Sequence, residues 1–192
     1  PLLAGKVFDY NIVFLIVSAL FLVSKGAKSI IVTASTIYNV ESFEPIKDNI
    51  KSIFIAILLI ILILFIIVIP VFGGKILNLI LTMTNTKFIT DRLIFIYNIL
   101  KWPITIFIIF ITLKLIYTIA PNKEIKSCSV NKGAIFTTVL WAIVTWIYSF
   151  YVTHLATYNI FYGSASNIII LMLWIYIISY IFVLGMGINA RK

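Results

Sequence analysis

The chain has 192 residues, of which 62% are apolar and 11% are charged, and its formal net charge is +9. Typical soluble domains carry roughly 25% charged and 45–50% apolar residues, so this composition excludes an ordinary water-soluble globule. The Lys and Arg residues are spread between apolar runs without a dense basic patch, which argues against nucleic-acid binding and is typical of charges that flank membrane spans.

Five apolar stretches are long enough to cross a bilayer, since ~20 helical residues cover ~30 Å of hydrocarbon. We predict spans over about residues 11–38, 53–72, 93–120, 133–155 and 167–189. Helices are expected because a bilayer offers no water to the backbone N–H and C=O groups, and the long runs lack the alternation of barrel strands. The predicted fold is an all-α, multi-pass transmembrane helical bundle that forms a single domain over residues 1–192.

The connections between these stretches are mostly polar. Glu41–Lys51 is short and contains a proline, and Pro121–Lys132 begins with the proline that is expected to stop the third helix. Ala156–Ser166 contains no charged residue, and Lys75–Arg92 is longer and mixed, which suits a short interfacial helix.

The distribution of basic residues predicts the orientation. One side of the membrane receives seven: Lys47, Lys51, Lys123, Lys126, Lys132, Arg191 and Lys192. The other side receives four: Lys6, Lys75, Lys87 and Arg92. Because cytoplasmic loops collect Lys and Arg, we expect the seven-residue side, and with it the C-terminus, to be cytoplasmic.

Polar residues recur on one face of the first span. They follow at spacings of 7, 7, 4 and 7 and are Asn11, Ser18, Lys25, Ser29 and Thr36. Such a stripe is expected to face a partner helix or a water-filled cavity. The alternative for Lys25 and Lys28 is that both side chains reach the cytoplasmic interface, since ~14 helical residues already cover ~21 Å.

A second polar face lies on the third span, where Asn98, Lys101, Thr105 and Thr112 share one side. Lys101 is expected roughly 13 Å into the span, and its two alternatives are a cavity or snorkelling to the outer surface. All six acidic residues lie at or beyond span ends, so no carboxylate is expected near a lysine within a span. If such a lysine faces a cavity, a bound anion would balance its charge. We therefore expect Lys25, Lys28, Lys101, Asn98 and Thr105 to bind an anionic substrate.

Catalytic chemistry is not expected. A metal site needs several His, Cys or carboxylate ligands at defined spacing, and the chain has one His and one Cys. His154 is expected to be a hydrogen-bonded residue at the outer interface. We predict no catalytic residues, no metal, no cofactor and no nucleic-acid partner, and expect membrane lipids and an anionic or lipid-linked substrate as ligands.

The second half of the chain holds a set of residues in a specific order. They are Pro121, Gly133, Tyr151, Tyr162, Gly163, Trp174, Gly185 and Asn189, and weaker matches in the first half are Ser24-Lys25-Gly26 and Tyr38. In these residues the chain resembles the YihY/BrkB family of bacterial inner-membrane proteins. It departs from the family at Gly185-Met186-Gly187, where members often have an acidic residue.

The resemblance implies a multi-pass protein of the bacterial cytoplasmic membrane. It also implies a further helix upstream of Pro1, which would give six spans with both ends inside. Members were once labelled as a ribonuclease, which these residues do not support, and family proposals centre on moving lipid-related molecules. We expect a transporter or flippase-like exporter of a lipid-linked or anionic substrate; the alternative is a non-transporting scaffold or accessory subunit of an envelope complex.

Overall fold

The computed structural model describes residues 10–40, 45–75, 87–154 and 164–191. Within these ranges the long helices are α1 (Tyr10–Ile37), α2 (Pro45–Ile67), α4 (Lys87–Ile119), α5 (Asn131–His154) and α7 (Ser164–Ala190), and a π-helical turn, η1 (Val68–Phe72), continues α2. Each of the five α-helices is long and apolar enough to cross a membrane. The predicted all-α, multi-pass bundle with five spans is therefore confirmed.

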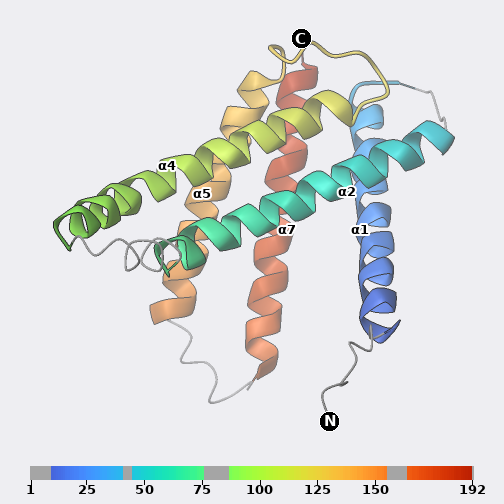
Figure 1. Ribbon diagram of the computed structural model, residues 1–192. Coiled ribbons are helices and arrows are strands. Elements are labelled where there is room, and N and C mark those ends of the chain that lie inside the picture. The colour runs from blue at the N-terminus through green and yellow to red at the C-terminus, as the bar shows by residue number, and fades with distance from the viewer. Residues whose placement is uncertain (1–9, 41–44, 76–86, 155–163, 192) are drawn as a thin grey trace.

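The helices form a bundle in which α2 and α4 cross obliquely in front of α1, α5 and α7 (Figure 1). The contacts are of α1 with α2 and α7, of α2 with α4, and of α5 with α4 and α7. Successive helices alternate in direction, so α1, α4 and α7 end where α2 and α5 begin (Figure 1). This side of the molecule, which includes the C-terminus, is called the C-terminal end below.

The buried core lies in the half of the bundle that is nearest to the C-terminal end. It combines the last part of α1, the first part of α2, the last part of α4, the start of α5 and the last part of α7, through Ala27, Ile31, Ala34, Ile55, Ala56, Leu113, Ile116, Tyr117, Ala134, Phe182 and Met186. Small residues let neighbouring backbones approach closely in a membrane bundle. The buried contacts between side chains of different helices are therefore concentrated at this end.

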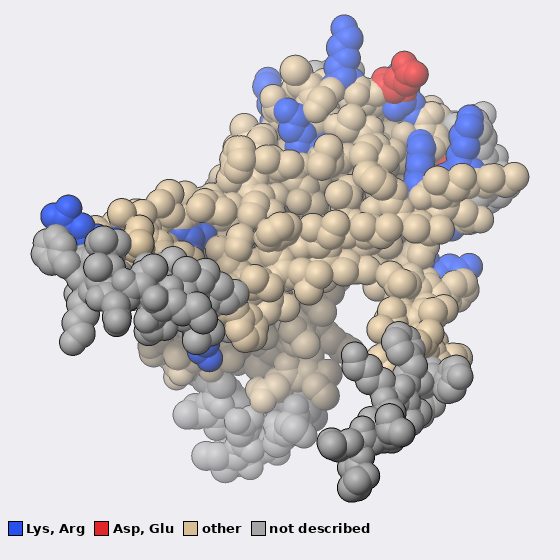
Figure 2. Space-filling view, viewed as in Figure 1, with Lys and Arg blue, Asp and Glu red and all other residues tan. Residues whose placement is uncertain are grey.

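The rest of the surface is strongly apolar. Large side chains such as Phe14, Phe107, Trp146 and Met172 are more than half exposed on four different helices. Figure 2 shows that the middle of the molecule is largely free of charged residues on this face, with Lys and Arg gathered at the C-terminal end and near the start of α4. A surface of this kind is stable in hydrocarbon and costly in water.

Two helices extend beyond the spans predicted for them, so parts of two predicted connections are the first turns of α2 and α4. The span expected from residue 53 belongs to α2, which begins at Pro45, and the span expected from residue 93 belongs to α4, which begins at Lys87. Proline suits the first turn of a helix because its missing N–H has no partner there. Counting apolar residues finds the part of a helix within hydrocarbon, whereas the helix itself continues into the polar interface. The remainder of the predicted interfacial segment, residues 76–86, lies outside the described residues.

Helix α1 ends in a defined cap. Asn39 adopts a φ of 52°, and the N–H groups of Tyr38 and Val40 donate to the carbonyls of Ala34 and Ser35 at 3.0 and 2.9 Å. Asparagine tolerates this left-handed conformation, which satisfies carbonyls at the end of a helix. The cap fixes the position of Tyr38, which lines a pocket together with the segment after α4.

Candidate functional site

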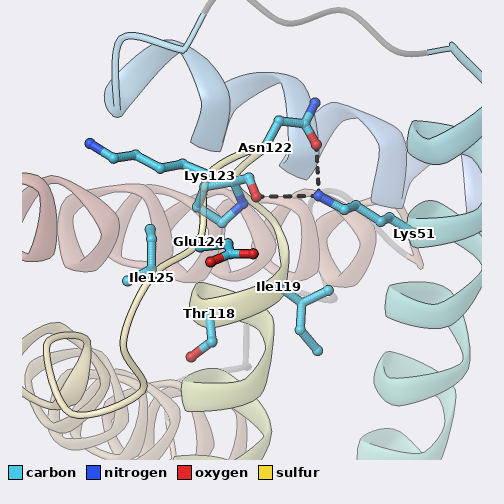
Figure 3. Close-up of a pocket in the computed structure, with 8 residues that line it drawn as sticks. Lys51, Thr118, Ile119, Asn122, Lys123, Glu124 and Ile125 are labelled. Carbon is cyan, nitrogen blue, oxygen red and sulfur yellow. Dashed lines mark hydrogen bonds between the residues drawn. The ribbon is translucent and has the colours of Figure 1, made fainter.

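A polar network connects the start of α2 to the segment that follows α4 (Figure 3). Lys51 Nζ donates to the carbonyl oxygen of Pro121 at 3.3 Å and to Asn122 Oδ1 at 2.7 Å. Asn122 Nδ2 donates to Asp48 Oδ1 at 2.8 Å. These hydrogen bonds join α2 to the segment after α4, between residues that are 70 to 74 positions apart in the sequence. We call Asp48, Lys51 and Asn122 the α2–α4 network.

Asp48 is the unusual member of this network because it is a carboxylate with only 2% of its surface exposed. It lies in the first turn of α2, where the unpaired N–H groups of a helix favour a negative charge. The hydrogen bond from Asn122 adds a second stabilising contact. Burial of this acid therefore depends on both the start of α2 and the loop after α4.

A pocket of about 390 Å³ lies beside the network. Figure 3 shows Lys51 reaching into it from α2, while Asn122, Lys123 and Glu124 come from the segment after α4. The Lys123 side chain points away from Lys51 in this view. The lining therefore combines two ammonium groups with one carboxylate, and the hydrogen bonds of Lys51 already occupy one side of it.

The two lysines of α1, Lys25 and Lys28, lie in different surroundings. Lys28 Nζ donates to Asn49 Oδ1 of α2 at 3.0 Å, whereas the exposed Lys25 lies 5.1 Å from the ring centroid of Phe21 on its own helix. Both line a groove of about 320 Å³ together with Ser29 and other residues of α1. This groove gives α1 a basic, hydroxyl-bearing outer face.

Lys101 interacts within α4. Its Nζ donates to Asn98 Oδ1 at 3.1 Å and lies 5.9 Å from the ring centroids of both Tyr97 and Trp102. Among the described residues these partners are an amide and two aromatic rings rather than a carboxylate. Thr105 is buried, and its hydroxyl donates to the carbonyl oxygen of Lys101 at 2.7 Å.

The predicted anion-binding residues therefore occupy two places. Lys25 and Lys28 line the α1 groove, and Lys101 is not among the residues of that groove. Asn98 and Thr105 accompany Lys101 on α4. Thr112 belongs to the same face of α4 and is buried, with its hydroxyl bonded to the carbonyl oxygen of Ile108 at 2.9 Å.

Three of the residues that suggested the family meet at one crossing of α5 and α7. The N–H of Gly133 donates to Asn189 Oδ1 at 2.7 Å, in a buried position. A Cβ atom at Gly133 would collide with the carbonyl oxygen of Gly185 and the amide of Asn189. Glycine is required here because the two backbones touch, and Asn189 then caps an N–H group at the start of α5.

Tyr117 of α4 completes this crossing. Its hydroxyl lies 2.8 Å from Thr137 Oγ1 and also donates to the carbonyl oxygen of Phe182 at 2.8 Å. The Tyr117 and Phe182 rings lie 5.0 Å apart. A Cβ atom at Gly185 would collide with Thr137 Oγ1 and crowd the Tyr117 hydroxyl. One buried phenol therefore connects three helices.

The remaining motif residues are distributed over the bundle. Pro121 is buried and accepts the hydrogen bond from Lys51. Trp174 stacks on Tyr148 with ring centroids 5.2 Å apart, and Tyr151 is half-buried on α5. Tyr162 and Gly163 lie outside the described residues.

The sequence contains only weak signals for the contacts that join the helices. Asp48 follows Pro45 in a helix-starting pattern, and Asn122 follows the proline that ends the third span. Neither pattern predicts that the two side chains contact each other. Tyr117 and Thr137 read as ordinary residues of apolar spans. Pairing of this kind depends on how helices cross, which a single sequence does not specify.

His154 lies exposed at the end of α5, with Nδ1 3.2 Å from the carbonyl oxygen of Phe150 and the two rings stacked at 4.6 Å. In the ranges that the structure describes, no group of three or more His, Cys, Asp and Glu residues is placed to hold a metal ion.

Comparison with known proteins places the chain among bacterial membrane proteins. It is 34% identical over 178 residues to YfkH of Bacillus subtilis (strain 168), which is named as ribonuclease-like; the match covers 92% of this chain and 64% of that protein. It is 38% identical over 69 residues to a UPF0761 membrane protein of Prosthecochloris aestuarii, with 36% of this chain and 16% of that protein covered. A third relative, a UPF0761 membrane protein of Idiomarina loihiensis, is 28% identical over 103 residues, or 54% and 36% of the two chains.

The chain thus spans less than two thirds of the length of each of these relatives. No solved structure matches it. The sequence model of the family described as Virulence factor BrkB matches residues 3–191, nearly the whole chain, which confirms the resemblance seen in the glycines and aromatic residues of the second half. The protein is therefore a multi-pass membrane protein that belongs to the BrkB family.

Proposed function

We propose that this protein moves a lipid-linked or anionic substrate across the bacterial cytoplasmic membrane, as a transporter or flippase-like exporter. The observation that supports this proposal is Lys101, a half-buried lysine within the span Arg92–Ile119 whose described partners are an amide and two rings. A charge within a span is costly and is usually retained for function. An anion passing along α4 would supply the negative charge.

The groove on α1 is the proposed approach for the substrate. Lys25 and Lys28 line it together with Ser29, and Lys25 is exposed. Ammonium and hydroxyl groups on the outer face of a span suit a phosphate or carboxylate that remains attached to a lipid tail. The substrate would enter from the bilayer without crossing open water.

The proposed orientation has the C-terminal end in the cytoplasm. Basic residues of the first turns of α2 and of the α4–α5 connection lie at that end with Arg191, and Figure 2 shows Lys and Arg gathered there. Cytoplasmic loops are enriched in Lys and Arg. The proposal includes no catalytic step. The ribonuclease-like name belongs to YfkH and contributes nothing to it.

A non-transporting scaffold or accessory subunit of an envelope complex is the second candidate. It is favoured by the polar face of α4, where Thr105 and Thr112 are buried and bonded to carbonyls of their own helix. Hydroxyls that are satisfied in this way do not need a water-filled path. A transport assay separates the two candidates.

Replacing Lys101 with leucine is expected to abolish transport, because the substitution removes the intramembrane charge and leaves a shorter, apolar side chain. The protein is reconstituted in vesicles, and the movement of labelled phosphatidylglycerol and, separately, of labelled chloride across the bilayer is measured. We expect the wild-type protein to exceed protein-free vesicles for one of these substrates and the variant to match them.

Lys114→Leu is the matched control, since Lys114 lies on the same helix near its C-terminal end and is expected to reach the interface. It should retain wild-type transport at equal amounts of protein. If the wild-type protein moves neither substrate above background, or Lys101→Leu moves as much as wild type, the proposal fails and the scaffold is favoured.

A further inference from the structure

A second pocket, of about 440 Å³, opens at the C-terminal end of the bundle. It lies between the end of α1, the segment after α4 and the end of α7. The polar residues in its lining are Tyr38, Asn39, Lys123, Glu124, Lys126, Ser129 and Asn189. None of these belongs to the anion site expected from the sequence, so the pocket is considered independently of Lys25 and Lys101.

Asn189 lines this pocket and carries a hydrogen-bond donor that has no partner among the described residues. Its Oδ1 accepts the N–H of Gly133, and because a backbone N–H requires an acceptor, this contact settles which end of the amide is oxygen. The Nδ2 group is therefore the one left over. Asn189 is only 5% exposed, and its Nδ2 group is buried without a hydrogen-bond partner among the described residues.

Tyr38 presents a second donor of the same kind. Its hydroxyl is buried and lacks a hydrogen-bond partner among the described residues. A tyrosine phenol is protonated at neutral pH and can donate, and burial raises the pKa of the Tyr38 phenol above its ordinary value. Buried polar groups are nearly always hydrogen-bonded, so two such donors in one lining indicate a missing acceptor.

The charges around the pocket indicate the chemistry of that acceptor. Lys123 and Lys126 are exposed residues of the lining, while Glu124 is its one carboxylate. Two ammonium groups and two uncharged donors match a group that carries several acceptor oxygens and a negative charge. Phosphate has this chemistry, and the pocket lies at the end of the bundle where basic residues gather (Figure 2).

We propose that the pocket formed by Tyr38, Lys123, Lys126 and Asn189 binds a phosphate group, either of a phospholipid headgroup or of a soluble phosphate ester. The phosphate oxygens accept from Asn189 Nδ2 and the Tyr38 hydroxyl, and the two lysines balance its charge. This site goes beyond the proposed transport function, and it holds whether or not the protein moves a substrate.

The lysines alone have a simpler explanation. The pocket lies at the C-terminal ends of α1 and α7, and a cation near the end of a helix is stabilised by the exposed carbonyl groups. That role leaves the donors of Asn189 and Tyr38 without acceptors. The decisive variants therefore change these donors rather than the charges only.

Binding is measured on the full chain purified in a neutral detergent. The soluble probe is glycerol 1-phosphate, titrated by calorimetry, and the lipid probe is phosphatidic acid, counted by native mass spectrometry with phosphatidylcholine as the competing lipid. Asn189→Asp keeps an oxygen for the N–H of Gly133 but replaces the free donor with a charged acceptor. We expect it to weaken binding about tenfold or more, and Tyr38→Phe and Lys126→Gln to weaken it less.

Lys132→Gln is the matched control, because Lys132 is an exposed lysine at the same end that does not line the pocket. It should bind like wild type. Wild-type binding of phosphatidic acid alone assigns a lipid headgroup, and binding of glycerol 1-phosphate assigns a soluble ester. Binding of neither probe, equal binding by wild type and Asn189→Asp, or an equal loss in Lys132→Gln would overturn the proposal, and none of these results depends on a transport assay.

Discussion

Gly185→Ala is expected to lower the free energy of unfolding by about 3 kcal/mol, the upper range for overpacking a tightly fitted site. The added Cβ would collide with Thr137 Oγ1, crowd the Tyr117 hydroxyl and lie 3.1 Å from the carbonyl oxygen of Gly133. The last contact is with backbone, which no side-chain rotation relieves. To admit one methyl group, α5 and α7 must separate where their contact is closest, and the hydrogen bond between Asn189 and Gly133 would lengthen.

The measurement is reversible unfolding in mixed micelles of a mild detergent and dodecyl sulfate, followed by circular dichroism. Gly187→Ala is the matched control: it lies two residues away on α7, and apart from its chain neighbours and the nearby backbone of α7 no atom lies within 4 Å of its added Cβ. This control should leave stability unchanged or raise it by up to about 1 kcal/mol, since alanine favours a helix more than glycine does. Equal stability of Gly185→Ala and Gly187→Ala would show that the crossing is not closely packed.

Tyr117→Ala is expected to be the most destabilising single change at the junction of α4, α5 and α7, at about 4 kcal/mol. Tyr117 is 1% exposed and packs against Phe182, so truncation leaves a cavity at a point where three helices meet. Tyr117→Phe keeps the ring and removes only the hydroxyl, which bonds to Thr137 and to the carbonyl oxygen of Phe182. Hydrogen bonds between membrane helices contribute roughly 0.6 kcal/mol on average and up to about 1.7, so we expect a loss of about 1–2 kcal/mol.

The same unfolding titration measures both variants. Tyr180→Ala provides the control because Tyr180 lies on α7 close to Phe182 and is 57% exposed. A change at this surface position should stay within about 0.5 kcal/mol. The order alanine, then phenylalanine, then control is the expected result, and a Tyr117→Phe variant as unstable as Tyr117→Ala would assign the main role to the hydroxyl instead of the ring.

Much of the fold was predictable because membrane spans are local features. A helix in hydrocarbon satisfies its own backbone within one continuous segment, so each of the five spans could be recognised from its own residues. The polar ends were placed less well. Pro45 and Lys87 begin their helices several residues before the apolar runs, since a helix in the interface needs turn and cap chemistry rather than hydropathy.

The site was predictable only in part. Lys101 stands out in the sequence because a charge inside a span is unusual, and its partner Asn98 lies one turn away on the same helix. The buried pairing of Asp48 with Asn122 joins residues 74 positions apart, and their local sequence looks like an ordinary polar connection. The same holds for Asn189, which reads as the end of a span and proves to cap the start of α5.

The sequence by itself determined that this chain lies in a membrane, that it crosses as helices, and that its glycines and aromatic residues follow the pattern of one family. Those properties depend on composition and on contacts within single segments. Only the tertiary structure decided that Gly133, Gly185 and Asn189 meet, and that Tyr38 and Asn189 border one pocket with two lysines. The physical reason is that lipid hardly distinguishes one apolar helix face from another, so the pairing of faces is decided by close packing and a few polar contacts between helices.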